Sequence, residues 1–139
     1  SKAKYTIDYS NYKARLITAQ EVAQITGNTT WDEKTSTSAF YFDTNTSTES
    51  PTCKKGNTTG CKYGWLYDRT DKSCTSRGCL NNADSSMIGI GYWTISPEAT
   101  YPFGAWNVCY AASLASSTID GGVTFGVRPV ITVLKSKLS

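Results

Sequence analysis

The sequence predicts an α+β fold with several strands, a short helix and long loop insertions. Three observations predict it. A Val-, Ile- and Thr-rich stretch at residues 124–133 is typical of a buried strand. A helix-capping pattern lies near the start, at residues 18–27, and a polar, cysteine-containing stretch occupies residues 43–86. We expect residues 1–139 to form a single domain, since this length suffices for one hydrophobic core.

The first elements are a short strand that ends near Ile17 and a helix of about two turns. Thr18 is followed three residues later by Glu21, the spacing of a capping box, in which each side chain bonds a backbone N–H at the helix start. Small apolar residues then recur at helical spacing. Gly27 suits the left-handed residue that ends a helix.

Several strands are predicted in the middle of the chain. The aromatic run at residues 40–42 predicts either a short strand or an anchor that pins a loop to the core. Residues 64–68 are rich in apolar and aromatic side chains and predict another strand. Residues 91–96 and 104–112 predict two further strands, because β-branched and aromatic residues are frequent in both.

The closing strand contains one arginine, Arg128, followed directly by Pro129. A proline lacks a backbone donor, so it belongs on an edge strand or at a break in the ladder. A buried guanidinium needs a partner, and we predict that Arg128 is architectural, with Glu21 as its first candidate partner.

Three short motifs carry a resemblance to a known family. They are Arg15-Leu16-x-Thr18-x-x-Glu21, Tyr92-Trp93-Thr94 and Gly126-Val127-Arg128-Pro129. In this order the chain resembles the bacterial and phage branch of the C-type-lectin-like fold. That branch includes formylglycine-generating enzymes, variable proteins diversified by retroelements, and pilin-like surface proteins that end in Gly-Val-Arg-Pro. The resemblance implies a C-type-lectin-like α+β domain with a mixed, mainly antiparallel sheet, one or two short helices and long loop insertions. Its two ends would meet in one sheet, and its central insertion would carry function.

Composition favours a protein of the cell exterior. Charged residues make up only 18% of the chain, while Ser and Thr are abundant. The net charge of +3 is small and dispersed, which argues against nucleic acid as a partner. No apolar run reaches the ~18 residues of a membrane span, so we expect no direct membrane insertion. We expect a fragment of a longer bacterial or phage surface protein whose export signal or anchor has been removed.

The cysteines predict a disulfide-stapled insertion at residues 43–86. Nearest-neighbour pairing gives Cys53–Cys61 and Cys74–Cys79, although crossed pairings remain open. Structural zinc is disfavoured because the chain has no histidine and no Cys-x-x-Cys pair. Cys109 stands apart in an apolar run and is interpreted as a small buried hydrophobe.

The sequence carries few signs of catalysis or of a bound cofactor. Without histidine, the usual general base and the His-dependent triads are missing. Formylglycine-generating enzymes rely on a cysteine pair in the C-terminal part of the fold, where this chain has Cys109 alone. The calcium motifs of animal C-type lectins are also incomplete, since Trp106-Asn107 is followed by Val108. We therefore expect no enzyme, no cofactor and no metal site.

The stretch before the closing strand combines Tyr, Ser, Asn and Thr in a mixture similar to that of antibody binding loops. Strand alternation predicts that Trp93 and Ile95 face inward, which would turn Thr94 and Ser96 outward. Residues 98–104 lack a strand period and predict a stiff exposed loop. The predicted ligand patch is Thr94, Ser96, Glu98, Tyr101, Phe103 and Asn107, with Tyr110 and Ser113 at its rim, and the predicted structural residues are Arg128, Glu21, Trp93 and Trp106.

These features predict an extracellular recognition or adhesion domain that binds a protein or carbohydrate on another cell or surface. In retroelement-diversified proteins the variable stretch precedes the terminal Gly-x-Arg-Pro strand, so the resemblance implies diversification here. One alternative is a structural or assembly module of a surface fibre or pilin-like protein, and another is an enzyme of the formylglycine-generating type. Aromatic side chains that point outward in a cluster would favour ligand binding, and inward ones a structural module.

Overall fold

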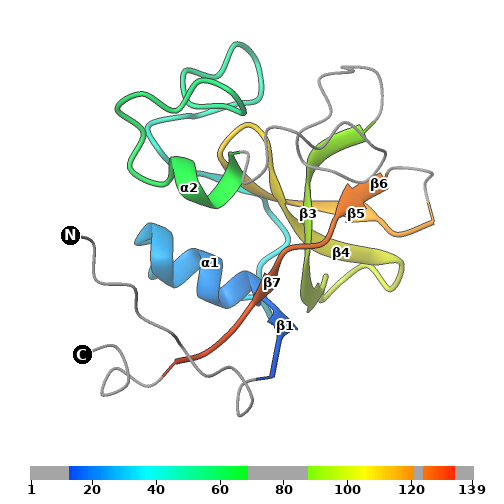
Figure 1. Cartoon of the computed structure of the whole chain (residues 1–139). Coiled ribbons are helices and arrows are strands. Elements are labelled where there is room, and N and C mark those ends of the chain that lie inside the picture. The colour runs from blue at the N-terminus through cyan, green and yellow to red at the C-terminus, as the bar shows by residue number, and fades with distance from the viewer. Residues whose placement is uncertain (1–12, 69–87, 121–123, 134–139) are drawn as a thin grey trace.

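The computed structural model describes residues 13–68, 88–120 and 124–133 (Figure 1). The fold is α+β, as predicted. Five strands form one sheet in the order β2-β5-β4-β3-β6, in which β3 and β6 are parallel and the other pairs antiparallel. The bounds are β2, Phe40–Tyr41; β3, Ile88–Pro97; β4, Gly104–Cys109; β5, Ser113–Thr118; and β6, Thr124–Gly126.

The two ends of the described chain meet in a second, two-stranded sheet. Strand β1 (Arg15–Leu16) pairs antiparallel with β7 (Pro129–Val130), with Leu16 opposite Pro129. The prediction that residues 124–133 form one continuous strand is therefore wrong, because β6 and β7 are separate strands in different sheets. The interruption lies at Val127 and Arg128, directly before the proline that was predicted to break the ladder.

Helix α1 (Ala19–Thr26) begins and ends as its sequence predicts. The Thr18 side chain accepts a hydrogen bond from the Glu21 backbone N–H, and the Glu21 carboxylate accepts one from the Thr18 N–H, so the capping box is complete. Gly27 has φ +81°, and its N–H bonds back to the last turn. These local interactions fix the length of α1.

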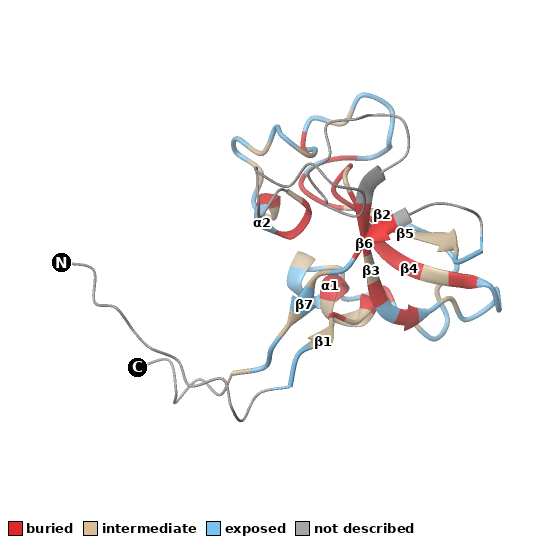
Figure 2. Ribbon diagram, turned by 45° about the vertical axis from the view of Figure 1, so that its right-hand side comes forward, coloured by how far each residue is buried: buried red, intermediate tan, exposed pale blue. Residues whose placement is uncertain are grey.

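Both helices lie on one side of the five-stranded sheet, and the core lies between them and the sheet (Figures 1 and 2). Tyr92, Trp106, Val108 and Leu114 are buried on the inner face of β3, β4 and β5. Trp31 and Trp106 pack edge to face, with ring centroids 4.9 Å apart. The prediction that Trp106 is structural is confirmed.

Two further elements, at residues 64–68 and at β5, differ from the sequence prediction. Residues 64–68 do not form a strand: α2 (Gly64–Tyr67) is a single helical turn, closed by a hydrogen bond from the Asp68 N–H to the Gly64 carbonyl. A short apolar run does not by itself distinguish a strand from a helical turn. Strand β5 is rich in serine and was not expected, but it pairs with β4 along its whole length.

The buried face of β3 is the opposite of the predicted one. Tyr92, Thr94 and Ser96 are buried, whereas Ile95 is exposed and Trp93 is half-buried. Trp93 packs on Phe125 of β6, with ring centroids 4.5 Å apart. Because both faces of β3 carry a large aromatic residue, apolar size alone does not decide between them. The hydrogen bonds described below show why the polar face is the inner one.

The Cys53–Cys61 disulfide is confirmed. It lies in a segment held largely by polar side chains, since Asn45 donates to the carbonyls of Cys53 and Ala111 and accepts from the Cys53 N–H. Cys109 is a buried free cysteine, as expected. The predicted Cys74–Cys79 pair lies outside the described residues.

Removing the disulfide should destabilise the fold. Replacing both Cys53 and Cys61 by serine is expected to lower the free energy of unfolding by about 2–3 kcal/mol, because an eight-residue loop is no longer closed in the unfolded chain. Urea unfolding of the parent and the double variant measures the loss. Non-reducing peptide mapping that recovers either cysteine as a free thiol would contradict the pairing.

The Glu21 carboxylate at the start of α1 should make the free energy of unfolding depend on pH in the acid range. The hydrogen bond from Arg15 holds the pKa of Glu21 at about 2, well below its usual value near 4.5. A depressed pKa stabilises the folded state above the unfolded pKa, and this stability is lost as the pH falls towards 2. Glu21→Gln should therefore cost about 1 kcal/mol at neutral pH, and the difference from the parent should shrink between about pH 5 and pH 2.

Urea unfolding across this pH range tests that expectation. Glu49→Gln is the matched control, because Glu49 is an exposed loop residue. A difference between parent and Glu21→Gln that stays constant down to pH 2 would contradict the role of the Glu21 charge.

Candidate functional site

The loop between β3 and β4 is a tight, hydrogen-bonded tip of the main sheet. The Glu98 N–H donates to the Gly104 carbonyl and the Gly104 N–H donates to the Tyr101 carbonyl, both at 2.9 Å. A Cβ atom on Gly104 would lie 2.7 Å from the Glu98 carboxylate and 2.8 Å from the Tyr101 ring, so a larger residue would force these two side chains to move. The prediction of a stiff exposed loop at residues 98–104 agrees with this geometry.

Two aromatic side chains project from this tip. Tyr101 is 44% exposed and Phe103 is 56% exposed, and their rings contact each other edge to face with centroids 6.2 Å apart. Ile119, at the end of β5, donates its N–H to the Phe103 carbonyl and is also exposed. Glu98 is half-buried at the base of the loop. We call Glu98, Tyr101, Phe103 and Ile119 the tip patch.

The prediction that Thr94 and Ser96 face a ligand is wrong, because both are buried. The Thr94 hydroxyl donates to the Trp106 carbonyl at 2.8 Å. The Ser96 hydroxyl donates to the Glu33 carboxylate at 2.6 Å and accepts from the Ala19 N–H at 2.9 Å. Ala19 is the first residue of α1, so Ser96 satisfies a backbone donor that the helix cannot. These two residues join β3 to α1 and β4.

Asn107 and Ser113 are also buried, at 1% exposure each, so their predicted place in an exposed patch is wrong. Asn107 lies opposite Trp93 and donates to the Ser117 hydroxyl at 3.0 Å. Tyr110 is half-buried, but it follows β4 at the end opposite to Phe103, roughly 20 Å along the strand. Tyr110 and Ser113 therefore do not form a rim around the tip patch.

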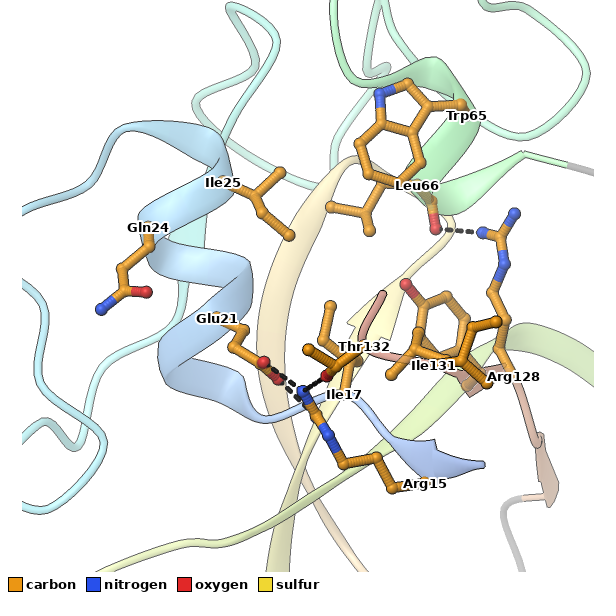
Figure 3. A pocket seen from close by; sticks show the side chains of 12 residues that line it. Arg15, Ile17, Glu21, Gln24, Ile25, Trp65, Leu66, Arg128, Ile131 and Thr132 are labelled. Atoms are coloured by element: carbon orange, nitrogen blue, oxygen red, sulfur yellow. Dashed lines mark hydrogen bonds and ion pairs between the residues drawn. The ribbon is translucent and has the colours of Figure 1, made fainter. Parts of the chain in front are cut away.

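The predicted pairing of Arg128 with Glu21 is wrong, because Glu21 pairs with Arg15 (Figure 3). Arg15 belongs to β1, next to the start of α1, and its guanidinium donates to the Glu21 carboxylate. Arg128 is half-buried and donates to the Leu66 carbonyl at 2.6 Å. Its guanidinium lies 5.5 Å from the centre of the Tyr92 ring, a cation–π contact. Arg128 is thus held by a backbone carbonyl and an aromatic ring.

The described residues offer little for catalysis or metal binding. Asp43 lies near Cys53 and Cys61, but these sulfurs are bonded to each other and are not thiolate ligands. The Asp43 carboxylate instead accepts hydrogen bonds from the Tyr63 N–H and the Tyr67 hydroxyl. Burial raises the pKa of the Cys109 thiol, so it remains a poor nucleophile at neutral pH. Neither helix in the described ranges has the length or apolar composition to cross a membrane.

The chain matches no protein-family model, no curated protein and no solved structure.

Ile119 is the member of the tip patch that sequence reasoning missed. It is a lone apolar residue between a Ser- and Thr-rich strand and the Asp120-Gly121-Gly122 sequence. An apolar residue at the end of a polar strand was the available signal. Its position beside Phe103 depends on the pairing of β4 with β5, which the sequence did not predict.

The burial of Ser96 leads to a stability prediction. Ser96→Ala would leave the Ala19 N–H and the Glu33 carboxylate without their shared partner, at a cost of about 1–3 kcal/mol. Urea unfolding measures the loss. Thr100→Ala, at an exposed position of the tip loop, is the control and should change stability by less than about 0.5 kcal/mol. Equal stability of Ser96→Ala and the parent would mean that Ser96 is not an anchor for α1.

Proposed function

We propose that this chain is an extracellular recognition domain that binds a protein or carbohydrate ligand through the tip patch. The observation that carries the proposal is the pair of exposed aromatic side chains, Tyr101 and Phe103, held at a tight turn. Exposed apolar groups are common on protein surfaces, but two aromatic rings in contact at the end of a hairpin are typical of a binding surface.

The tip patch is suited to binding because its shape is set before a ligand arrives. The hydrogen bonds at Gly104 and the contact between the two rings restrict the loop, so little conformational entropy remains to be lost on binding. Aromatic rings offer a large contact area with few rotatable bonds. Glu98 adds a polar group beside them that can orient a ligand by hydrogen bonding.

A C-type-lectin-like fold on a bacterial or phage surface is part of the same proposal. The pairing of β1 with β7, which joins the two ends, is what the resemblance implies. The Cys53–Cys61 disulfide supports an oxidising location outside the cytosol. Diversification by a retroelement would be compatible with the exposed tip. It would not suit Asn107 and Ser113, whose burial restricts the side chains that fit there.

The orientation of the aromatics also favours ligand binding over a structural module of a surface fibre or pilin-like protein. Tyr92 and Trp106 point inward, but Tyr101 and Phe103 point outward together. The formylglycine-generating type of enzyme has less support, since the free cysteine in the described part of this region, Cys109, is buried with a raised pKa.

Removal of either tip aromatic should weaken ligand binding strongly without unfolding the protein. The test is binding of the labelled chain to an array of surface glycans and immobilised extracellular proteins. Tyr101→Ala and Phe103→Ala should each weaken the bound signal by at least about tenfold, the loss of a hot-spot side chain. Their melting temperatures should stay close to that of the parent, because both rings are exposed.

Val127→Ala is the control, since Val127 is 67% exposed and lies between β6 and β7, outside the tip patch. Binding that survives both tip variants, or is lost only in Val127→Ala, would contradict the tip patch as the binding site. No binding to any member of the array would favour the structural module.

A further inference from the structure

A second surface feature, independent of the tip patch, is an apolar groove between α1, α2 and β7. Its volume is about 410 Å³, within the range of small-ligand sites (Figure 3). Six apolar residues line it, and they come from both ends and the middle of the chain: Ile17, Ile25, Trp65, Leu66, Val130 and Ile131. We call this surface the α1–β7 groove.

The apolar side chains at the edge of the α1–β7 groove are open to solvent. Trp65 is 60% exposed, and Ile25 and Ile131 are 38% exposed each. Three large apolar residues around one concave surface would all lose contact with water if a ligand filled it. The ligand should therefore present apolar groups to the groove.

Within the part of the chain that the structure describes, the α1–β7 groove has three charged side chains in its wall, two of which form an ion pair with each other. Arg15 and Glu21 form an ion pair and neutralise each other. Arg128 lies elsewhere on the wall, and no carboxylate among the described residues forms an ion pair with it (Figure 3). Of the described residues that line this wall, Arg128 is therefore the charged group without an ion-pair partner, which favours a ligand with a single negative charge.

Arg128 is also positioned to bind an anion. Its hydrogen bond to the Leu66 carbonyl and its contact with Tyr92 fix the guanidinium, whose five N–H donors leave others for a ligand. Burial raises the pKa of Tyr92 to about 12, so the neighbouring hydroxyl stays neutral and adds no negative charge. A planar guanidinium held in place suits two-point binding of a carboxylate.

We infer that the α1–β7 groove binds the apolar C-terminal end of a partner polypeptide. The terminal carboxylate pairs with Arg128, and the preceding apolar side chains fill the space beside Ile25, Trp65 and Ile131. A chain terminus fits better than an internal acidic residue, because its carboxylate directly follows consecutive apolar side chains. The partner chain also stops at this carboxylate, beside the Arg128 guanidinium.

The test uses a pool of acetylated tetrapeptides whose last three residues are drawn from Leu, Ile, Val and Phe. The pool is prepared once with free C-terminal carboxylates and once with C-terminal amides. Binding is followed by chemical-shift changes in the amide and indole signals of the labelled chain, among which the Trp65 indole reports on the groove. The free acids should bind at least about tenfold more tightly than the amides.

Three variants separate the contribution of the Arg128 charge from that of the apolar contacts. Arg128→Gln should give the acids and the amides equal affinity. Ile131→Glu places a carboxylate at the half-exposed edge, and it should also remove the preference for the acids without disturbing the hydrogen bond to Leu66. Trp65→Ala should weaken both pools. The Ile131 variant keeps the proposal testable if Arg128→Gln does not fold.

Several outcomes would overturn the proposal. Equal affinity of the parent for acids and amides would remove the role of Arg128. No shift with either pool, or binding of decanoate without binding of the peptides, would exclude a peptide terminus. Concentration-dependent dimerisation that Ile131→Glu abolishes would place a second copy of the chain in the groove instead. Because the tip patch is untouched by these variants, the outcomes are separate from those for Tyr101 and Phe103.

Discussion

Strand β3 connects the other parts of this fold, and the choice of its buried face determines what each of them contacts. It pairs with β4 on one side and with β6 on the other, and the Ile95 N–H donates to the Ile17 carbonyl just after β1. The buried Ser96 hydroxyl receives the first N–H of α1. With Ser96 turned outward, this N–H and the Glu33 carboxylate would lose that partner, at a cost comparable to a buried unsatisfied group.

The same choice creates the surroundings of Arg128. Because Tyr92 lies on the inner face of β3, its ring is available beneath the guanidinium, which then reaches the Leu66 carbonyl. The position of Leu66 depends in turn on polar side chains earlier in the chain. Asp43 accepts hydrogen bonds from the Tyr63 N–H and the Tyr67 hydroxyl and so holds both ends of α2. A segment with few apolar residues is thus fixed by a buried carboxylate, a buried amide and a disulfide.

The two proposed binding surfaces differ in how they are built. The tip patch consists mostly of one short loop, so its shape depends on local hydrogen bonds around Gly104. The α1–β7 groove takes its wall from residues near both ends of the described chain and from α2, so it exists only when these segments are packed together. A domain with two such surfaces can bind one ligand at its tip while the groove retains a separate polypeptide end.

The sequence by itself determined the features that depend on neighbouring residues. These were the capping box at Thr18 and Glu21, the end of α1 at Gly27, the exposed loop before Gly104 and the interruption directly before Pro129. Each is decided by the conformation or bonding of a few residues that are close in the chain. The Cys53–Cys61 pair was the first of several pairings that the sequence left open.

Only the tertiary structure decided which groups meet across the fold. Alternation shows that Tyr92 and Trp93 lie on opposite faces of β3, but not which face α1 covers. Likewise, a carboxylate at Glu21 predicts a cationic partner, but only the path of β1 shows that Arg15 takes it and leaves Arg128 to the groove. Local patterns specify conformation, whereas burial and pairing depend on side chains that are distant in sequence, and those distances close only on folding.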